Sequence, residues 1–433
     1  MTHDEWGGQP VPVHLAYGRE GLTLDLPGPI DVVAAPFVPG LPDEPAALRA
    51  ALRQPIGSPP LAALVKPGDR VVIAHSDITR PTPNDRILPI VLTEIEAAGV
   101  ARRDITLLNA LGTHRPQTAA ELRGMLGSEI SDRYRCVQHN AFDDDQLVSF
   151  GATSLGHPVR LNRHLMEADV KILTGFIEPH FFAGFSGGPK AVLPALAGTE
   201  SVFTNHGYEM IAHGNATWGI THGNPIWEEM LEIALLVRPV FLLNVTLNNR
   251  RQITGVFAGD LRQAHAAGCA SVREHAMVKV REPYDVVLTS NSGYPLDQNL
   301  YQTVKGMSAA NRIVREGGAI IMAAACADGL PDHGKYAALL AAGGSPRGVL
   351  DLLARPGFCE HDQWQVQLQA QIQLRAAVHV YSDSLTDRQI QRALFTPCRD
   401  LARTVAELRQ QHGPRVCVMP DGPQTIATLE TAN

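Results

Sequence analysis

The 433-residue sequence lacks the features of several large classes of protein. It has no unbroken apolar run of the roughly 18 residues that a membrane-spanning helix needs, so we expect no membrane span. It has no concentrated run of Lys and Arg, and its formal net charge is −7, so nucleic acid is not an expected partner. The opening residues MTHDEWGGQPVP contain no apolar segment, and we expect no secretory signal.

Cysteine is scarce and dispersed. The six cysteines lie at positions 136, 269, 326, 359, 398 and 417 and form no CxxC pair. This spacing supports neither a zinc ribbon nor a small disulfide scaffold, and a reducing cytoplasm is the simplest setting. If the protein binds a metal, we expect histidine to be the protein ligand.

The common nucleotide and zinc motifs are also missing. The sequence has no GxGxxG fingerprint, which argues against an NAD-dependent dehydrogenase. FSGGPK at 185–190 is not a P-loop, because AVLP follows its lysine. His206, His213 and His222 are separated by 7 and 9 residues, which matches no helical zinc pair such as HExxH.

One pattern recurs along the chain: a short apolar, β-branched run and then a polar segment. Examples of the apolar runs are RVVIA, DITLLNA, ADVKILTG, YDVVLTS, GGAIIMAAA, AAVHVYS and RVCVMP. Runs of this length that are buried on both faces are typical of parallel sheets, and helix-length segments such as ILPIVLTEIEAAG lie between several of them. We therefore predict an α/β fold with open, largely parallel twisted sheets flanked by helices. Residues 13–26 predict two further strands joined by a Gly-containing turn.

The length of the chain suits two domains. We place the boundary near 270–283, which predicts an N-terminal catalytic and cofactor-binding domain, 1–272, and a C-terminal α/β domain, 273–433, that contributes substrate-pocket residues. Ligands of open α/β sheets bind beyond the carboxyl ends of the strands, where the polar segments lie. The cleft between the domains is the expected active site.

Two of these polar segments carry candidate functional groups. HSDITRP (75–81) contains Asp77, Thr79 and Arg80, and arginine suits bidentate recognition of carboxylate or phosphate. The alternative is a local Asp–Arg pair that braces a turn. LGTHRP (111–116) places His114 beside Arg115, a cation that favours a neutral imidazole base. The alternative is a loop histidine bonded to a backbone carbonyl.

The segment IEPHFFAGFSGGPKAVLPALAG (177–198) combines His180 and Lys190 with phenylalanines and glycines. Because glycine permits positive φ, FSGGPK could form an anion-binding nest from Ser186, Gly187 and Gly188 beside Lys190. The alternative is a tight turn that leads into a helix over KAVLPALAG.

A fourth segment, GYPLDQNLYQTVKG (293–306), follows a strand and is expected to run into a helix. Gln298, Tyr301, Gln302 and Lys305 fall at helical spacings, and Gln302 and Lys305 would share one face. A neutral donor and a cation on one face suit a carboxylate or ketone oxygen. The alternative is a solvated helix face.

Taken in order, HSDITRP, GTHRP, EPHFFAGFSGGPK, the following NH and PLDQNLYQTVKG resemble the lactate racemase family. The resemblance runs from about residue 66 to about residue 310. It implies a nickel-pincer nucleotide, nickel pyridinium-3,5-bisthiocarboxylic acid mononucleotide, as cofactor. It also implies enzymes of cofactor biosynthesis as partners for loading, and a small 2-hydroxy acid as substrate.

The resemblance also implies roles for single residues. Lys190 would anchor the cofactor, His206 would bind nickel, and Asp77 would contact the nucleotide. His114 and His180 would be the two acid/base groups. The implied substrate-binding residues are Arg80 near the substrate oxygens, Gln302 and Lys305 as polar pocket groups, and Tyr301 as a pocket wall.

The residue chemistry agrees with racemisation by hydride removal. The Cα proton of a 2-hydroxy acid is very weakly acidic, whereas loss of hydride gives a planar 2-keto acid that can be reduced on either face. A base on each face is then required, which His114 and His180 could supply, while Phe181 or Phe182 excludes water. The alternatives are the same chemistry on malate, a longer aliphatic or aromatic 2-hydroxy acid or a sugar acid, and a non-racemase nucleotide-binding or cofactor-carrying protein.

Overall fold

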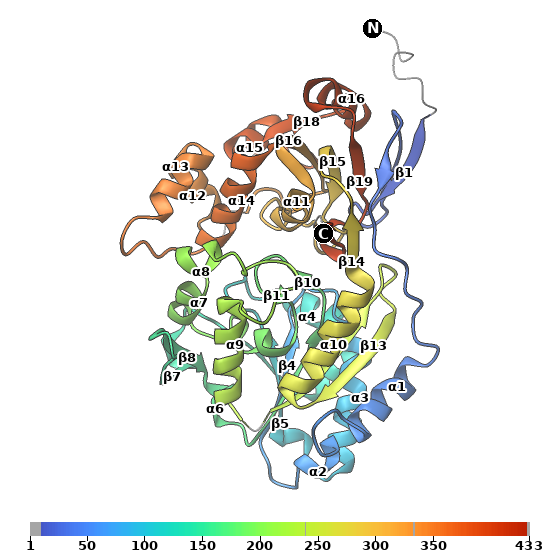
Figure 1. Ribbon diagram of the computed structural model, residues 1–433. Coiled ribbons are helices and arrows are strands. Elements are labelled where there is room, and N and C mark those ends of the chain that lie inside the picture. Colours follow the sequence, from blue (N-terminus) through green and yellow to red (C-terminus); the bar gives the residue numbers. More distant parts are fainter. Residues whose placement is uncertain (1–9, 239, 332–333, 431–433) are drawn as a thin grey trace. The chain divides into compact units, whose positions relative to one another are not determined.

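The computed structural model describes residues 10–238, 240–331 and 334–430, which form two compact units (Figure 1). The N-terminal unit comprises Phe37–His206 and His213–Glu274. The C-terminal unit comprises residues 10–36, Gly207–Ala212 and the described residues from His275 onward. The division of the chain into two consecutive domains, 1–272 and 273–433, stays a prediction.

The N-terminal unit is built around a six-stranded sheet in the order β13-β12-β9-β4-β5-β6. All neighbouring strands are parallel except the antiparallel pair β12 and β13. The strands of the sheet are β4 Val71–Ser76, β5 Ile105–Ala110, β6 Arg135–Gln138, β9 Val170–Phe176, β12 Val240–Leu247 and β13 Ile253–Gly259. The short pairs beside it are β7 Leu147–Ala152 with β8 Pro158–Asn162, and β10 Pro179–His180 with β11 Gly184–Phe185.

Helices flank this sheet, as the sequence predicts. They are α1 Glu44–Arg53, α2 Leu61–Leu64, α3 Asn84–Ala97, α4 Ala119–Leu126, α5 Ser128–Arg133, α6 Arg163–Glu167, α7 Thr199–Asn205, α9 Pro225–Leu236 and α10 Leu261–Ala276. The expected apolar side of α3, with Leu88, Val91, Leu92 and Ile95, is buried against the sheet core. Each such side chain contributes roughly 1.5–3 kcal/mol relative to exposure.

The C-terminal unit has a second six-stranded sheet, all parallel, in the order β18-β17-β16-β15-β19-β3. Its strands are β3 Asp31–Val32, β15 Tyr284–Ser290, β16 Val314–Ala323, β17 Ala377–Tyr381, β18 Thr396–Cys398 and β19 Val416–Met419. The remaining strands are the hairpin β1 Val11–Leu15 and β2 Leu22–Leu26, and the pair β14 Met277–Val280 and β20 Ile426–Leu429. The helices are α8 Tyr208–Ala212, α11 Val304–Asn311, α12 Tyr336–Gly343, α13 Pro346–Leu353, α14 Gln363–Arg375, α15 Asp387–Arg392 and α16 Leu401–His412. The α/β fold and its parallel sheets are therefore confirmed.

Two expected helices differ from the structure. Residues 298–303 form bends and turns, and α11 begins only at Val304; within this stretch the Asn299 side chain accepts the backbone N–H of Gln302 at 3.1 Å, which stabilises a turn. In KAVLPALAG (190–198) only Lys190 and Ala191 are helical, and they are the end of the short 3₁₀ helix η3, Gly188–Ala191. Pro194 lacks the N–H that a continued helix would need.

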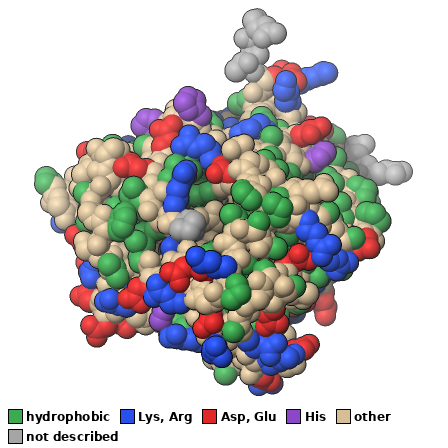
Figure 2. Space-filling view, turned by 90° about the horizontal axis from the view of Figure 1, so that it is seen from below, with side chains coloured by type: hydrophobic (Ala, Val, Ile, Leu, Met, Phe, Trp, Pro, Cys, Tyr) green, Lys and Arg blue, Asp and Glu red, His purple; other side chains and the backbone are tan. Residues whose placement is uncertain are grey.

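The face of the protein drawn in Figure 2 carries a mixture of charged and apolar side chains. Basic and acidic side chains are interspersed with apolar ones over the face drawn in Figure 2. None of the helices in the described part of the chain is both long enough and apolar enough to cross a bilayer.

Candidate active site

The polar segments of the N-terminal unit gather at one edge of its sheet. Strands β4, β5 and β9 are adjacent and parallel, so their carboxyl ends meet at the same edge. Asp77 directly follows β4, His114 follows β5, and His180 follows β9. This topology places at one edge of the sheet residues that are up to 103 positions apart in the chain (180 minus 77).

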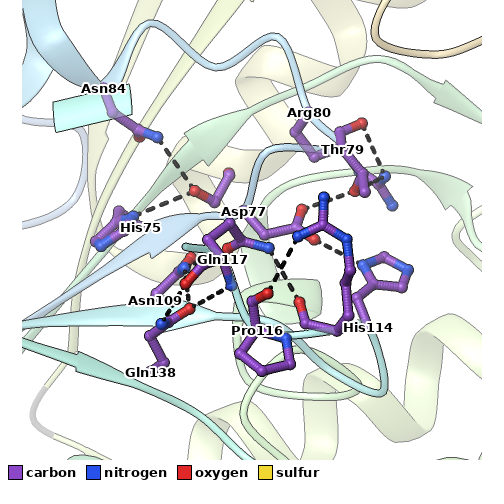
Figure 3. Close-up of polar contacts among 12 residues, drawn as sticks. His75, Asp77, Thr79, Arg80, Asn84, Asn109, His114, Pro116, Gln117 and Gln138 are labelled. Atoms are coloured by element: carbon purple, nitrogen blue, oxygen red, sulfur yellow. Dashed lines mark hydrogen bonds and ion pairs between the residues drawn. The ribbon is translucent and has the colours of Figure 1, made fainter. Parts of the chain in front are cut away.

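His114 is held by a buried carboxylate. Its Nδ1 lies 2.7 Å from Oδ2 of Asp77, and the hydroxyl of Thr79 donates to Oδ1 of the same carboxylate at 2.7 Å (Figure 3). Arg80 donates to the Thr79 hydroxyl at 2.9 Å. Burial opposes ionisation of Asp77, but the charges of His114 and Arg80 and the hydrogen bonds outweigh it, so the pKa of Asp77 lies below its usual value. Asp77 is therefore a carboxylate.

An amide cluster fixes the loop that carries His114 (Figure 3). Gln138 on β6 accepts the backbone N–H of Gln117 and donates to its carbonyl, both at 2.8 Å. Asn109 on β5 donates to the Gln117 side chain. Arg115 pairs with Glu121 at 2.7 Å, so its cation is offset by a carboxylate and does not set the proton state of His114 alone. The sequence pattern did not mark these amides, although Asn109 lies within strand β5 and Gln138 is the last residue of strand β6.

Both ring nitrogens of His180 have hydrogen-bond partners. The backbone N–H of Ala183 donates to Nδ1 at 3.2 Å, which places the proton of a neutral ring on Nε2. Nε2 lies 3.0 Å from Nζ of Lys190, which belongs to η3. That contact places the lysine amine at the ring nitrogen opposite the one that Ala183 bonds.

Phenylalanines join this pair to His206. The ring of Phe182 lies 4.5 Å from the ring of His180 and 4.9 Å from that of His206, and Phe181 lies 4.7 Å from His180. His206 follows α7 and is 2% exposed. Burial, and then the charge of Lys190, hold the pKa of His206 well below its usual value. A neutral imidazole is the form that binds a metal.

The glycine loop is packed tightly against the protein. Gly187 and Gly188 have φ of +72° and +53°, and the N–H of Gly188 donates to the Asn244 side chain at 2.7 Å. A Cβ on Gly188 would lie 2.5 Å from the ring of His265, which itself bonds the Ser186 carbonyl at 2.9 Å. Because the N–H of Gly188 is used inside the protein, an anion-binding role for Ser186, Gly187 and Gly188 stays a prediction. Sequence reading missed Asn244 and His265, which no local motif marks.

A second candidate group lies in the C-terminal unit. Gln302 and Lys305 are 4% and 7% exposed, so the alternative of a solvated helix face is wrong. The hydroxyl of Tyr301 accepts the indole N–H of Trp364 at 2.9 Å, and Gln365 donates to the Tyr301 carbonyl. Trp364 and Gln365, both from α14, anchor this segment and were not marked by the sequence.

Comparisons with known proteins cover both units. A model of the lactate racemase N-terminal domain matches residues 17–219, and a model of the C-terminal domain matches residues 279–427. The lactate racemase of Thermoanaerobacterium thermosaccharolyticum is 35% identical over 423 residues, which is 96% of this chain and 98% of that protein. The chain belongs to the lactate racemase family. The lactate racemase of Lactiplantibacillus plantarum is 38% identical over 379 residues, 86% of this chain and 88% of that protein.

Solved structures agree with this membership. The lactate racemase apoprotein of T. thermosaccharolyticum matches with a TM-score of 0.89 and 34% identity, over 96% of this chain and 100% of that one. A Thermotoga maritima protein at 17% identity matches with a TM-score of 0.72, over 91% and 100% of the chains, which shows the fold alone. As a member of the lactate racemase family, the chain is an isomerase of the racemase type.

Members of the lactate racemase family use a cofactor. The side chains of this chain that could bind a metal can be compared with those that the expected cofactor would need. Among the described residues, no group of three or more His, Cys, Asp or Glu side chains could hold a metal ion. The cofactor that the sequence resemblance implies would bring most of its own metal donors and would need only one imidazole from the protein. The neutral, buried His206 with Lys190 nearby fits that need.

Proposed function

We propose that this member of the lactate racemase family inverts C2 of a 2-hydroxy acid, with lactate as the first substrate to test. The observation that carries the proposal is the contact chain from Lys190 through His180 and Phe182 to His206. It unites an acid/base group, an amine and a neutral metal ligand within the unit that the N-terminal family model matches. Both full-length relatives at 35% and 38% identity are lactate racemases.

The cofactor of the proposal is the nickel-pincer nucleotide. Lys190 would hold it, His206 would ligate the nickel, and Asp77, Thr79, Ser186, Gly187 and Gly188 are the remaining proposed cofactor-binding residues. When bound, the cofactor would supply a carrier that accepts a hydride and returns it. The proposal includes a cytoplasmic location and the cofactor-biosynthesis enzymes as loading partners.

The protein's own residues bind the substrate and move its hydroxyl proton. One histidine, His114 or His180, accepts this proton as C2 is oxidised to a ketone, and the other donates a proton when C2 is reduced on the opposite face. Arg80 of the N-terminal unit would bind the substrate oxygens, and Gln302, Lys305 and Tyr301 of the C-terminal unit are the remaining proposed substrate-binding residues. The buried rings of Phe181 and Phe182 exclude water from the neighbourhood of His180.

The test uses protein co-produced with the cofactor-making enzymes. Chiral chromatography follows the conversion of L-lactate to D-lactate and the reverse, together with malate, longer aliphatic, aromatic and sugar 2-hydroxy acids. We expect His114→Ala and His180→Ala each to lower kcat/KM by roughly 10²–10⁴-fold while nickel content is retained. Full activity in either variant would remove that histidine from the mechanism.

The same assay separates the alternative functions. A protein that retains nickel and nucleotide but interconverts no acid of the panel would be a cofactor-carrying protein rather than a racemase. Conversion of malate or a longer acid in preference to lactate would keep the chemistry and change the substrate.

A further inference from the structure

We propose that Asp77 is the positioning residue of His114 and keeps the ring proton on Nδ1, so that Nε2 is the atom that exchanges a proton with substrate. This inference deepens the proposed function and depends on it for its catalytic meaning. It gives Asp77 a different task from the nucleotide contact that the family resemblance implies.

The proton placement follows from the contacts of Asp77. An ionised carboxylate only accepts hydrogen bonds, so the 2.7 Å contact from Oδ2 to Nδ1 of His114 requires a proton on Nδ1. The Thr79 hydroxyl donates to the other oxygen and prevents the carboxylate from rotating away. The bare nitrogen of the neutral ring is then Nε2. The His114 side chain is 31% exposed while that of Asp77 is 4% exposed, so the ring is open to a ligand and its partner is not.

The other charged groups near His114 do not replace Asp77. Arg80 acts on the carboxylate through Thr79, and Arg115 is paired with Glu121. If Asp77 were lost, none of the other residues that hold the His114 loop would supply a carboxylate to the His114 ring.

His180 is held in the opposite way. Its Nδ1 accepts the Ala183 N–H, so its neutral ring carries the proton on Nε2, toward Lys190. The two histidines are thus not equivalent in the resting protein: the ring nitrogen without a proton is Nε2 in His114 and Nδ1 in His180, where it accepts the Ala183 N–H.

The chain contains a matched pair outside this group. Nδ1 of His157 lies 2.7 Å from Oε1 of Glu229, with side-chain exposures of 28% and 1%, close to those of His114 and Asp77. Glu229→Gln therefore serves as a control for the loss of a buried carboxylate beside an imidazole. Glu121→Gln serves as a control for changes in the His114 loop itself.

The first experiment reads the proton directly, without cofactor or substrate. Two-bond ¹H–¹⁵N NMR of histidine-labelled, cofactor-free protein distinguishes the tautomers, and His114→Gln assigns the signal. We expect Nδ1–H in the wild type and Nε2–H in Asp77→Asn, because the amide would donate to Nδ1. Glu229→Gln should change the His157 signal only, and Glu121→Gln should leave the His114 tautomer unchanged. An Nε2–H tautomer in the wild-type protein overturns the proposal.

The second experiment is kinetic and uses the loaded enzyme. We expect Asp77→Asn to lower kcat/KM by roughly 10²–10⁴-fold with nickel content unchanged. The factor should be equal for the two enantiomers, because they have equal free energies in solution. Asp77→Glu keeps the charge and should recover at least tenfold of the loss, whereas Glu121→Gln should stay within about threefold of the wild type. A loss of nickel in Asp77→Asn that parallels the loss of activity would favour the nucleotide contact instead.

The two experiments separate the proposal from the proposed function. If the wild type shows Nδ1–H at His114 but interconverts no 2-hydroxy acid, the positioning stands and the racemase function fails. If Asp77→Asn does not fold, the wild-type tautomer and Asp77→Glu still decide the matter. Full activity in a folded Asp77→Asn refutes the positioning role.

Discussion

Substitution of Gly188 by alanine tests whether the glycine loop needs both its backbone conformation and its close packing. Gly188 has a φ of +53°, a region where an alanine costs about 1–2 kcal/mol. Its new Cβ would also lie 2.5 Å from the ring of His265. That ring cannot move freely, because it is 1% exposed and bonds the Ser186 carbonyl at 2.9 Å. Overpacking of a fixed core group costs about 1–3 kcal/mol.

The two costs add to about 2–5 kcal/mol for Gly188→Ala. For a unit of about 200 residues each kcal/mol lowers the melting temperature by about 2–4 °C. Gly156→Ala is the matched control, since Gly156 also has positive φ, +80°, but a Cβ there would have no atom within 4 Å. It should show only the conformational cost of about 1–2 kcal/mol.

Thermal unfolding followed by calorimetry, with nickel and nucleotide content after co-production as a second measurement, checks this prediction. Gly188→Ala should melt lower than Gly156→Ala and should hold less cofactor, because Lys190 lies two residues beyond the substituted position. Equal melting temperatures for the two variants would show that His265 does not constrain the loop, and the packing argument would fail.

Two further predictions concern single histidines. His206→Ala should lose nickel, measured by metal analysis after co-production, whereas the exposed His222→Ala should keep it; retained nickel in His206→Ala would end the ligand assignment. Burial lowers the pKa of His139 from 6.5 to about 4, so the unfolded chain binds the proton first and stability falls as the pH drops from about 6.5 to about 4. Between pH 7 and pH 5 this group costs about 2 kcal/mol, and His139→Gln should reduce the acid-induced drop in the denaturant midpoint; an unchanged drop would contradict this.

Several candidate site residues could be selected from the sequence because their neighbours in the chain mark them. Asp77, His114 and His180 each follow an apolar run that the chain buries on both faces, and side chains after parallel strands meet at one edge. Gln302 and Lys305 were also recognisable, but their helix was placed too early. The turn in which Asn299 accepts the N–H of Gln302 depends on a short polar side chain, which a spacing pattern does not detect.

The sequence by itself determined the α/β class, seven strands of the two main sheets and the edge at which the polar groups gather, because those depend on periodicity and burial within short segments. Only the tertiary structure decided which groups touch. Asp77 reaches His114 across 37 positions, and Gly188 reaches Asn244 across 56. Proton placement depends on such contacts, since a ring nitrogen responds to the donor or acceptor a few ångströms away and not to its neighbour in the chain. Arg115, adjacent to His114 in sequence, is paired with Glu121, while the distant Asp77 holds the imidazole.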